Sequence, residues 1–150
     1  MEQEQSILVV EDSDEDYFTF QRILRKRALR YPLVRCQKGE EALDFLHQRG
    51  KFVQTVSNPG RLPSLILLDL NIIGLDGRAV LADIKQSDKV KQIPVVIYTT
   101  SADPRDIDYC YAQGANSYIL KIVPFETLGE QIQRIFDYWF RLVRLPEKDR

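Results

Sequence analysis

Four groups of polar residues each follow an apolar run of the sequence, and their side chains are of the kinds that bind metal ions and phosphate. The groups are Glu11 and Asp12, then Asp69, then Thr99, Thr100 and Ser101, and finally Lys121. Each group alone is an ordinary feature of a strand end, where helix caps are common. Their joint occurrence, in complementary chemical roles, indicates one shared site.

Carboxylates gathered at one edge of a sheet need a cation among them, because their charges repel one another. Mg²⁺ meets this need, since it prefers oxygen ligands in an octahedron and retains some of its waters. Two or three of the carboxylates of Glu11, Asp12 and Asp69, with a backbone carbonyl, are therefore expected to hold Mg²⁺. One carboxylate oxygen then remains free to act as a nucleophile.

A carboxylate is a weak base but a competent acceptor of a phosphoryl group, since that transfer requires positioning and charge neutralisation more than nucleophilic strength. Mg²⁺ and the ammonium of Lys121 are expected to supply the positive charge. The hydroxyl of Thr99 can donate a hydrogen bond to a third phosphoryl oxygen. The residues thus predict phosphoryl transfer to a carboxylate, with a contact that can move the loop after Thr99.

Short apolar runs rich in β-branched residues predict the strands that position these groups. The runs cover residues 7–10, 65–68 and 95–98, with weaker ones near 33–34 and 118–120. Continuous rather than alternating hydrophobicity indicates burial on both faces, as in a parallel sheet covered by helices. Helical spacing of apolar residues is present at 15–29, 39–49, 77–87, 104–113 and 125–143.

The order of these elements predicts an α/β fold of (βα)₅ type, with a doubly wound, five-stranded parallel sheet. Ligands of such sheets bind beyond the carboxyl ends of the strands, which is where the polar groups lie. Helix N-caps are expected at Ser13 or Asp14, at Asp76 and at Asp103. The connection from 50 to 63 is longer than usual, and no function is assigned to it.

Composition excludes several classes of protein. A length of 150 residues with 44% apolar content predicts a single domain over 1–150 with a packed core. Twenty-two acidic and 21 basic residues nearly cancel, so no nucleic-acid partner is expected. No apolar run approaches the roughly 20 residues that span a bilayer. The acidic start and two widely separated cysteines, Cys36 and Cys110, favour a cytoplasmic protein with reduced thiols.

Four stretches of the chain resemble the receiver domain of two-component response regulators. They are ILVVED at 7–12, LLDLN at 67–71 with GLDG at 74–77, PVVIYT at 94–99 and YILK at 118–121. The resemblance covers roughly residues 6–140 and implies a flavodoxin-like, CheY-like fold, with an extended C-terminal helix and a C-terminal extension over about 136–150. TTS at 99–101 and FDYW at 136–139, followed by LP at 145–146, are similar to regulators that partner cyanobacterial phytochromes.

This resemblance implies that Asp69 accepts a phosphoryl group from a sensor histidine kinase, of the cyanobacterial phytochrome type. The donor histidine is expected to come from that partner, because His47 is the chain's one histidine and lies on a helix remote from the acidic residues. The resemblance further implies that Glu11, Asp12 and Asp69 hold Mg²⁺ together with the backbone carbonyl of Asn71.

The resemblance also implies a switch rather than an enzyme that turns over a substrate. Thr99 is expected to be the switch hydroxyl and Lys121 the ammonium that faces the phosphate. Tyr118 is either an aromatic that turns inward when the threonine moves or an ordinary core residue. Asn71 and Ser101 are candidates for setting the phosphoryl lifetime. Catalysis is expected to be limited to autophosphorylation from phosphodonors and slow autodephosphorylation.

Three departures from the family pattern are visible. Ile73 stands where receivers often have proline, so the turn after Asp69 is expected to be looser or differently shaped. Ile122 and Val123 separate Lys121 from Pro124, so that loop is expected to differ, and the third departure is the long 50–63 connection.

Two other classes of protein compete with the phosphorelay switch. A Mg²⁺-dependent aspartyl phosphatase needs a second aspartate two residues beyond the nucleophile as general acid, and this chain has Asn71 there. A phosphorylation-independent interaction module is favoured only if the acidic residues bind no metal.

The C-terminal helix is predicted to form a homodimer together with the adjoining surface of the last strand. Its apolar residues cover an arc of roughly 200°, about twice the stripe that a surface helix needs. The expected contacts are Phe136, Tyr138, Trp139 and Phe140. The alternative is that these aromatic residues fold back over the edge of their own sheet.

Overall fold

The five predicted strands form one parallel sheet. The computed structural model describes residues 5–53, 61–121 and 124–146. Its strands are β1 (Ile7–Val10), β2 (Leu33–Cys36), β3 (Leu65–Leu68), β4 (Val95–Thr99) and β5 (Ser117–Leu120). They pair in the order β2-β1-β3-β4-β5, and every pair is parallel. The prediction of a doubly wound α/β fold is therefore confirmed.

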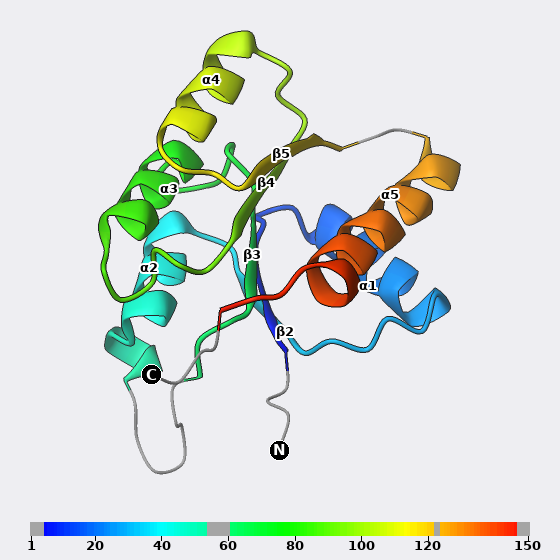
Figure 1. The fold of residues 1–150 in the computed structure, drawn as a ribbon, viewed down its shortest axis with the longest axis horizontal. Helices are drawn as coiled ribbons and strands as arrows, with labels where there is room; N and C mark the ends of the chain where they lie inside the picture. Colours follow the sequence, from blue (N-terminus) through cyan, green and yellow to red (C-terminus); the bar gives the residue numbers. More distant parts are fainter. Residues whose placement is uncertain (1–4, 54–60, 122–123, 147–150) are drawn as a thin grey trace.

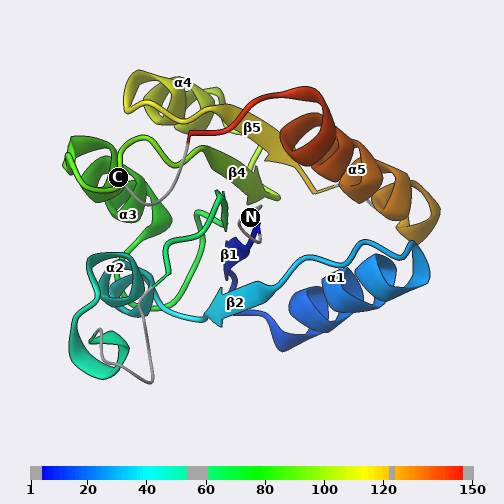
Figure 2. The same ribbon diagram turned by 60° about the horizontal axis from the view of Figure 1, so that its bottom comes forward.

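Helices cover both faces of this sheet. The α-helices within the described ranges are α1 (Asp14–Lys26), α2 (Gly39–His47), α3 (Gly77–Gln86), α4 (Pro104–Ala112) and α5 (Phe125–Asp137). Helices α1 and α5 lie on one face, and α2, α3 and α4 lie on the other (Figure 1, Figure 2). Each face has its own cluster of buried apolar side chains. Burial on both faces explains why β1, β3 and β4 read as unbroken apolar runs.

Side-chain caps begin three of the helices, as the residue types predict. Ser13 accepts from the Asp16 amide at the start of α1, Asp76 from the Arg78 amide at α3, and Asp103 from the Arg105 amide at α4. Each cap satisfies a backbone N–H that has no partner within the helix. Since the caps follow β1, β3 and β4, they fix how the chain turns at the carboxyl edge of the sheet.

The C-terminal aromatic residues pack mostly against their own chain. Helix α5 continues into one turn of π-helix, η2 (Tyr138–Leu142). Phe136 and Trp139 are 1% and 9% exposed, and Phe140 stacks on Tyr31 with 4.5 Å between ring centroids. Tyr138 remains 47% exposed. The predicted dimer surface is therefore narrower than the sequence indicated, because Tyr31 on the α1–β2 connection covers part of the apolar arc.

The two cysteines are free thiols buried in the sheet and in α4. Cys36 and Cys110 are both fully buried. Burial raises the pKa of the Cys36 thiol to about 12 and that of the Cys110 thiol to about 11. In the described ranges, no helix combines the length and the apolar character needed to cross a membrane.

The long connection before β3 is described only in part. It begins with a short 3₁₀ helix, η1 (Gly50–Phe52), whose Phe52 ring packs edge-on against Phe45 of α2. Residues 54–60 lie outside the described residues. Ile122 and Val123, where the loop after Lys121 was expected to depart from the family pattern, also lie outside them.

Candidate functional site

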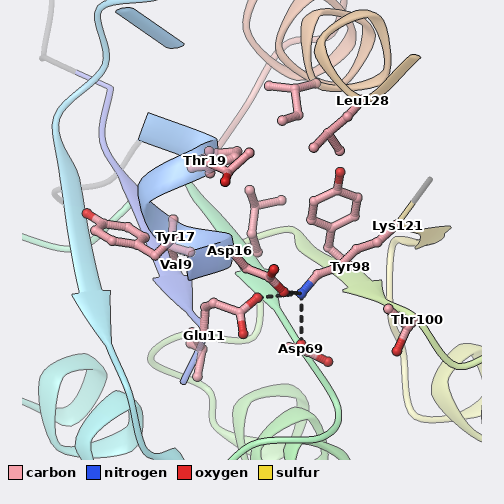
Figure 3. A pocket seen from close by; sticks show the side chains of 14 residues that line it. Val9, Glu11, Asp16, Tyr17, Thr19, Asp69, Tyr98, Thr100, Lys121 and Leu128 are labelled. Carbon is pink, nitrogen blue, oxygen red and sulfur yellow. Dashed lines mark hydrogen bonds and ion pairs between the residues drawn. The ribbon is translucent and has the colours of Figure 1, made fainter. Parts of the chain in front are cut away.

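The ammonium of Lys121 lies among three carboxylates at the carboxyl edge of the sheet (Figure 3). It donates to Glu11, to Asp69 Oδ2 at 2.9 Å and to Asp16 Oδ2 at 3.3 Å. The side chains of Lys121, Glu11 and Asp69 are only 13%, 8% and 11% exposed. The group is therefore a largely buried charge cluster and not a surface salt bridge.

The ends of the strands carry these groups to the same place. Glu11, Asp69 and Lys121 are the residues that directly follow β1, β3 and β5. The strand pairing continues one step past the sheet, since the Asp69 amide donates to the Val10 carbonyl at 3.1 Å and the Lys121 amide to the Thr99 carbonyl at 2.9 Å. Backbone hydrogen bonds thus set the positions of the carboxylate and the ammonium.

Burial and pairing act in opposite directions on the charges of this cluster. Burial raises the pKa of Glu11 above its ordinary value, although the hydrogen bond and charge of Lys121 oppose the rise. Burial alone would lower the pKa of Lys121, but its hydrogen bond to Glu11 and the charge of Asp69 outweigh this effect, and the pKa of Lys121 is raised. The ammonium of Lys121 therefore stays protonated, because the neighbouring carboxylates of Glu11 and Asp69 stabilise its charged form.

An apolar pocket of about 150 Å³ adjoins the cluster between α1 and α5. Val9, Phe20 and Leu128 line it, and Figure 3 shows the ring of Tyr98 directed past Lys121 toward Leu128. The Tyr98 hydroxyl donates to Gln131 Oε1 at 2.7 Å, away from the carboxylates. These apolar walls limit access of water on one side of the cluster, which strengthens the attraction between Lys121 and its partners.

The residues predicted to hold metal follow two neighbouring strands, β1 and β3, but their side chains are not arranged around a common point. Within the described part of the chain, no three Asp, Glu, His or Cys side chains are placed to hold a metal ion. Glu11 and Asp69 are engaged by Lys121, whereas the half-exposed Asp12 follows Glu11 directly at the end of β1. The donor set consists of hard oxygen ligands, so in chemical type it fits Mg²⁺ or Mn²⁺.

The loop that follows Asp69 is held in place by α2 and by its own cap. Asp69 Oδ1 accepts from the Asn71 amide at 3.2 Å, and Glu40 Oε1 accepts from the Leu75 amide at 2.7 Å. Ile73 forms a bridge with Lys38 while its side chain is 60% exposed. Contacts with α2 and its N-cap thus hold this loop although position 73 is not proline, and the expectation of a looser or differently shaped turn stays a prediction.

Thr99 and Tyr118 both connect to Ser101 in the loop between β4 and α4. Thr99 is fully buried, and its Oγ1 accepts from the Ser101 amide at 3.4 Å. Tyr118 is half-buried, and its hydroxyl donates to the Ser101 carbonyl at 2.8 Å. Tyr118 is therefore attached to the loop that Thr99 begins, which is the connection that a switch role requires.

Sequence reasoning did not identify Asp16, Arg78 or Asp106. Asp16 lies in the first turn of α1, which begins shortly after Glu11 and Asp12, and this position was a signal that it lies near the same edge of the sheet. Arg78 in α3 and Asp106 in α4 form a two-pronged ion pair, with Nε–Oδ1 and Nη2–Oδ2 both at 2.8 Å. Nothing in the sequence pairs these two, since 28 residues separate them.

Comparison with known proteins decides what this arrangement is. The sequence model of the protein family described as the response regulator receiver domain matches residues 7–133 of this chain. The chain belongs to this family. Members of this receiver family are generally phosphoacceptor switches and not enzymes that turn over a substrate, and receiver domains bind a divalent metal.

The relatives of this receiver include phytochrome regulators. Response regulator Rcp1 of Synechocystis sp. is 39% identical over 140 residues, which are 93% of this chain and 92% of Rcp1. The phosphorylated cyanobacterial phytochrome response regulator RcpA superposes with a TM-score of 0.87 at 34% identity, covering 97% of this receiver and 100% of RcpA. The Mn(2+)-bound form of Rcp1 gives a TM-score of 0.85 at 38% identity, covering 95% and 99%. The resemblance stated from the motifs is confirmed.

Proposed function

We propose that this receiver accepts a phosphoryl group on Asp69 from a sensor histidine kinase and then changes conformation to signal. One observation carries the proposal. The Asp69 carboxylate stands at the carboxyl edge of the sheet, with Oδ2 on the ammonium of Lys121 and Oδ1 on the Asn71 amide. A nucleophile held from both sides is positioned for transfer, and positioning supplies most of the catalysis in phosphoryl transfer.

The other residues of the site have roles that follow from their contacts. Glu11 and Asp12 would hold the divalent ion with Asp69 and the Asn71 carbonyl, and that ion supplies positive charge to the transferring group. Lys121 already pairs with Asp69 and would pair with the bound phosphoryl group. Thr99 would donate its hydroxyl to the new anion while its Oγ1 still accepts from the Ser101 amide, so that the loop moves with it.

The proposed partner is a histidine kinase of the phytochrome type. The support is the similarity to Rcp1 and RcpA over nearly the whole chain. Both cysteines are free thiols, which agrees with the cytoplasm as the proposed location. The whole chain is proposed to act as one receiver domain with Mg²⁺ as its metal.

The first test is chemical phosphorylation of the full chain. Incubation with acetyl phosphate and Mg²⁺ should add one phosphoryl group, which intact-mass and peptide mass measurements should place on Asp69. The reaction should stop when a chelator removes Mg²⁺, because the site loses the positive charge of the ion. It should slow in Asp12→Ala, because the ion loses an oxygen ligand. Asp69→Asn under the same conditions is the control. A parent protein that gains no mass would instead favour a phosphorylation-independent interaction module.

We also propose that the receiver is a homodimer that uses β5, α4 and the C-terminal turn. The edge strand β5 and its neighbours expose large apolar side chains: Tyr109, Tyr111, Leu120, Tyr138 and Leu142 are 38% to 75% exposed. Pairing like surfaces about a twofold axis is the simplest closed arrangement. Trp139 would support this surface from below, since it is buried and packs edge-on against Tyr138, whereas Phe136 packs toward α1 against Phe20 and Tyr31.

Lysine at Tyr138 and Leu142 should therefore convert the dimer to a monomer. Both side chains are exposed, so the double variant should fold while placing two charges in an apolar interface. Sedimentation equilibrium between about 1 and 100 µM measures the change. Phe18, an aromatic residue on α1, is 59% exposed, which lies between the values for Tyr138 and Leu142. Phe18→Lys should therefore sediment as the same oligomer as the parent. A monomeric parent over this range would contradict the proposed dimer.

A further inference from the structure

Ser101 lies two residues beyond Thr99, and each of its polar groups is engaged. Its amide donates to Thr99 Oγ1, its hydroxyl donates to Asp106 Oδ2 at 2.6 Å, and its carbonyl accepts from the Tyr118 hydroxyl at 2.8 Å. Because the Ser101 amide is bonded to Thr99 Oγ1, a movement of Thr99 toward Asp69 that keeps this bond must move Ser101 as well. The Asp106 contact is one of the bonds that resist this movement.

Asp106 is itself fixed to α3 by Arg78. The Arg78 guanidinium donates hydrogen bonds to Asp106 from Nε and Nη2. Its third nitrogen, Nη1, donates to both carboxylate oxygens of Asp76 at 3.0–3.1 Å. All three guanidinium nitrogens are thus used, and Asp76 is the N-cap of the same helix. Ser101 is connected through Asp106 and Arg78 to a rigid element of the fold.

An ion pair that is exposed to solvent contributes little to stability, so the exposure of the Arg78–Asp106 pair decides whether it can restrain the loop. The side chains of Arg78 and Asp106 are 30% and 17% exposed. The neighbouring pair of Arg105 with Asp103 is 90% and 37% exposed, and its only bond to Ser101 among the described contacts is from the Asp103 backbone amide to the Ser101 hydroxyl oxygen at 3.4 Å, not from the paired side chains. Two-pronged geometry, partial burial and a shared hydroxyl distinguish the first pair from the second.

We propose that Arg78 and Asp106 are positioning residues that form a latch, which holds Ser101 and the β4–α4 loop in the resting position and so opposes the movement of Thr99 toward a phosphoryl group on Asp69. The inference rests on the proposed function, since it concerns how easily that phosphoryl group switches the loop. The hydrogen bonds of Arg78 and Asp106 in the described structure go to each other, to Asp76 and to Ser101, and not to Asp69. The effect of the latch passes through Ser101.

Linkage gives the direction of the effect. An interaction that is present in the resting state and lost in the switched state lowers the affinity for any ligand that favours the switched state. Beryllium trifluoride is such a ligand, because it binds an aspartate carboxylate as a phosphoryl mimic. Removing the latch should tighten its binding by about fivefold, which is the lower end of common coupling strengths.

Two variants that change the charge in opposite directions make the test specific. Asp106→Asn removes a negative charge and Arg78→Gln removes a positive charge, but both break the latch. Simple electrostatics would make the first bind the anion more tightly and the second more weakly. The latch predicts tighter binding for both, as measured by calorimetric titration of beryllium fluoride in the presence of Mg²⁺.

Arg105→Gln is the matched control, because it removes an equal charge from the exposed pair on the same helix. It should bind the mimic with the affinity of the parent. Affinities of Asp106→Asn and Arg78→Gln that move in opposite directions, or that both match the parent, would overturn the latch. Thermal unfolding of each variant verifies that it is folded at the temperature of the titration.

Failure of the proposed function would look different. If the parent protein binds no beryllium fluoride, the proposed role of Asp69 is contradicted. The latch is then tested by hydrogen exchange of the protein without ligand. Amide hydrogen exchange at Ser101 should be faster in Asp106→Asn and Arg78→Gln than in the parent or in Arg105→Gln. Equal exchange in all four proteins would overturn the latch by this second measurement.

Discussion

Replacing Lys121 with methionine should destabilise the receiver at neutral pH by about 3 kcal/mol, because breaking a buried ion pair leaves charges without compensation. Methionine keeps the length of the side chain and removes the ammonium that pairs with Glu11, Asp16 and Asp69. The loss should be read from urea unfolding, as a lower free energy of unfolding with an unchanged slope.

The destabilisation of Lys121→Met should depend on pH in a definite direction. Burial already raises the pKa of Glu11, and removing Lys121 takes away the hydrogen bond that opposes this rise. A carboxyl group whose pKa is higher in the folded state than in the unfolded state favours folding at low pH, and this contribution is lost as the pH rises. The gap between variant and parent should therefore be widest near neutrality and should narrow toward about pH 4.

Lys91→Met is the control for this prediction. Lys91 also forms an ion pair, with Asp88, but the two side chains are 50% and 95% exposed, so its loss should cost little. If Lys121→Met were as stable as Lys91→Met at neutral pH, the charge cluster would not be the stabilising feature described here.

Replacing Gly77 with alanine should slow phosphorylation by roughly 10- to 100-fold, since a small misplacement of a reacting group has effects of that size. A Cβ at this first residue of α3 would lie 2.6 Å from Leu70 Cα and closer still to the Asp69 carbonyl oxygen. Both neighbours are backbone atoms that cannot rotate away. The segment carrying Asp69 must shift, and the free energy of unfolding should also fall by about 1–3 kcal/mol.

Gly129→Ala separates this steric effect from a general effect of losing a glycine. Gly129 is buried in α5, but the atoms nearest to an added Cβ belong to the guanidinium of Arg27, the movable end of a long side chain. This variant should phosphorylate at the parent rate and gain up to about 1 kcal/mol of helix stability. Equal phosphorylation rates in Gly77→Ala and the parent would show that the backbone at Asp69 tolerates the substitution.

The sequence was sufficient for the sheet and for the centre of the site. Strands β1, β3 and β4 are covered on both faces, so their apolar runs are unbroken and their ends are sharp. The polar residues at those ends then had to share one edge, which is why the meeting of Asp69 with Lys121 was predictable. Caps such as Asp76 were predictable because the residue type and the backbone N–H it satisfies are local.

Contacts between elements far apart in the chain were not predictable. The arc of apolar residues on α5 was read as a surplus because nothing in the sequence shows that Tyr31 reaches Phe136 and Phe140. Arg78 and Asp106 were likewise missed, since charged residues in the first turns of two helices are ordinary. Periodicity reports which face of an element is apolar, but it does not report which neighbour covers that face.

The deep burial of both cysteines has a practical consequence for following the switch by spectroscopy. Only the thiolate reacts quickly with maleimides and related labels, and neither Cys36 nor Cys110 is accessible or ionised near neutral pH. A third cysteine introduced at exposed Asp108 on α4 would therefore take a fluorophore or spin label selectively, with both native thiols left in place.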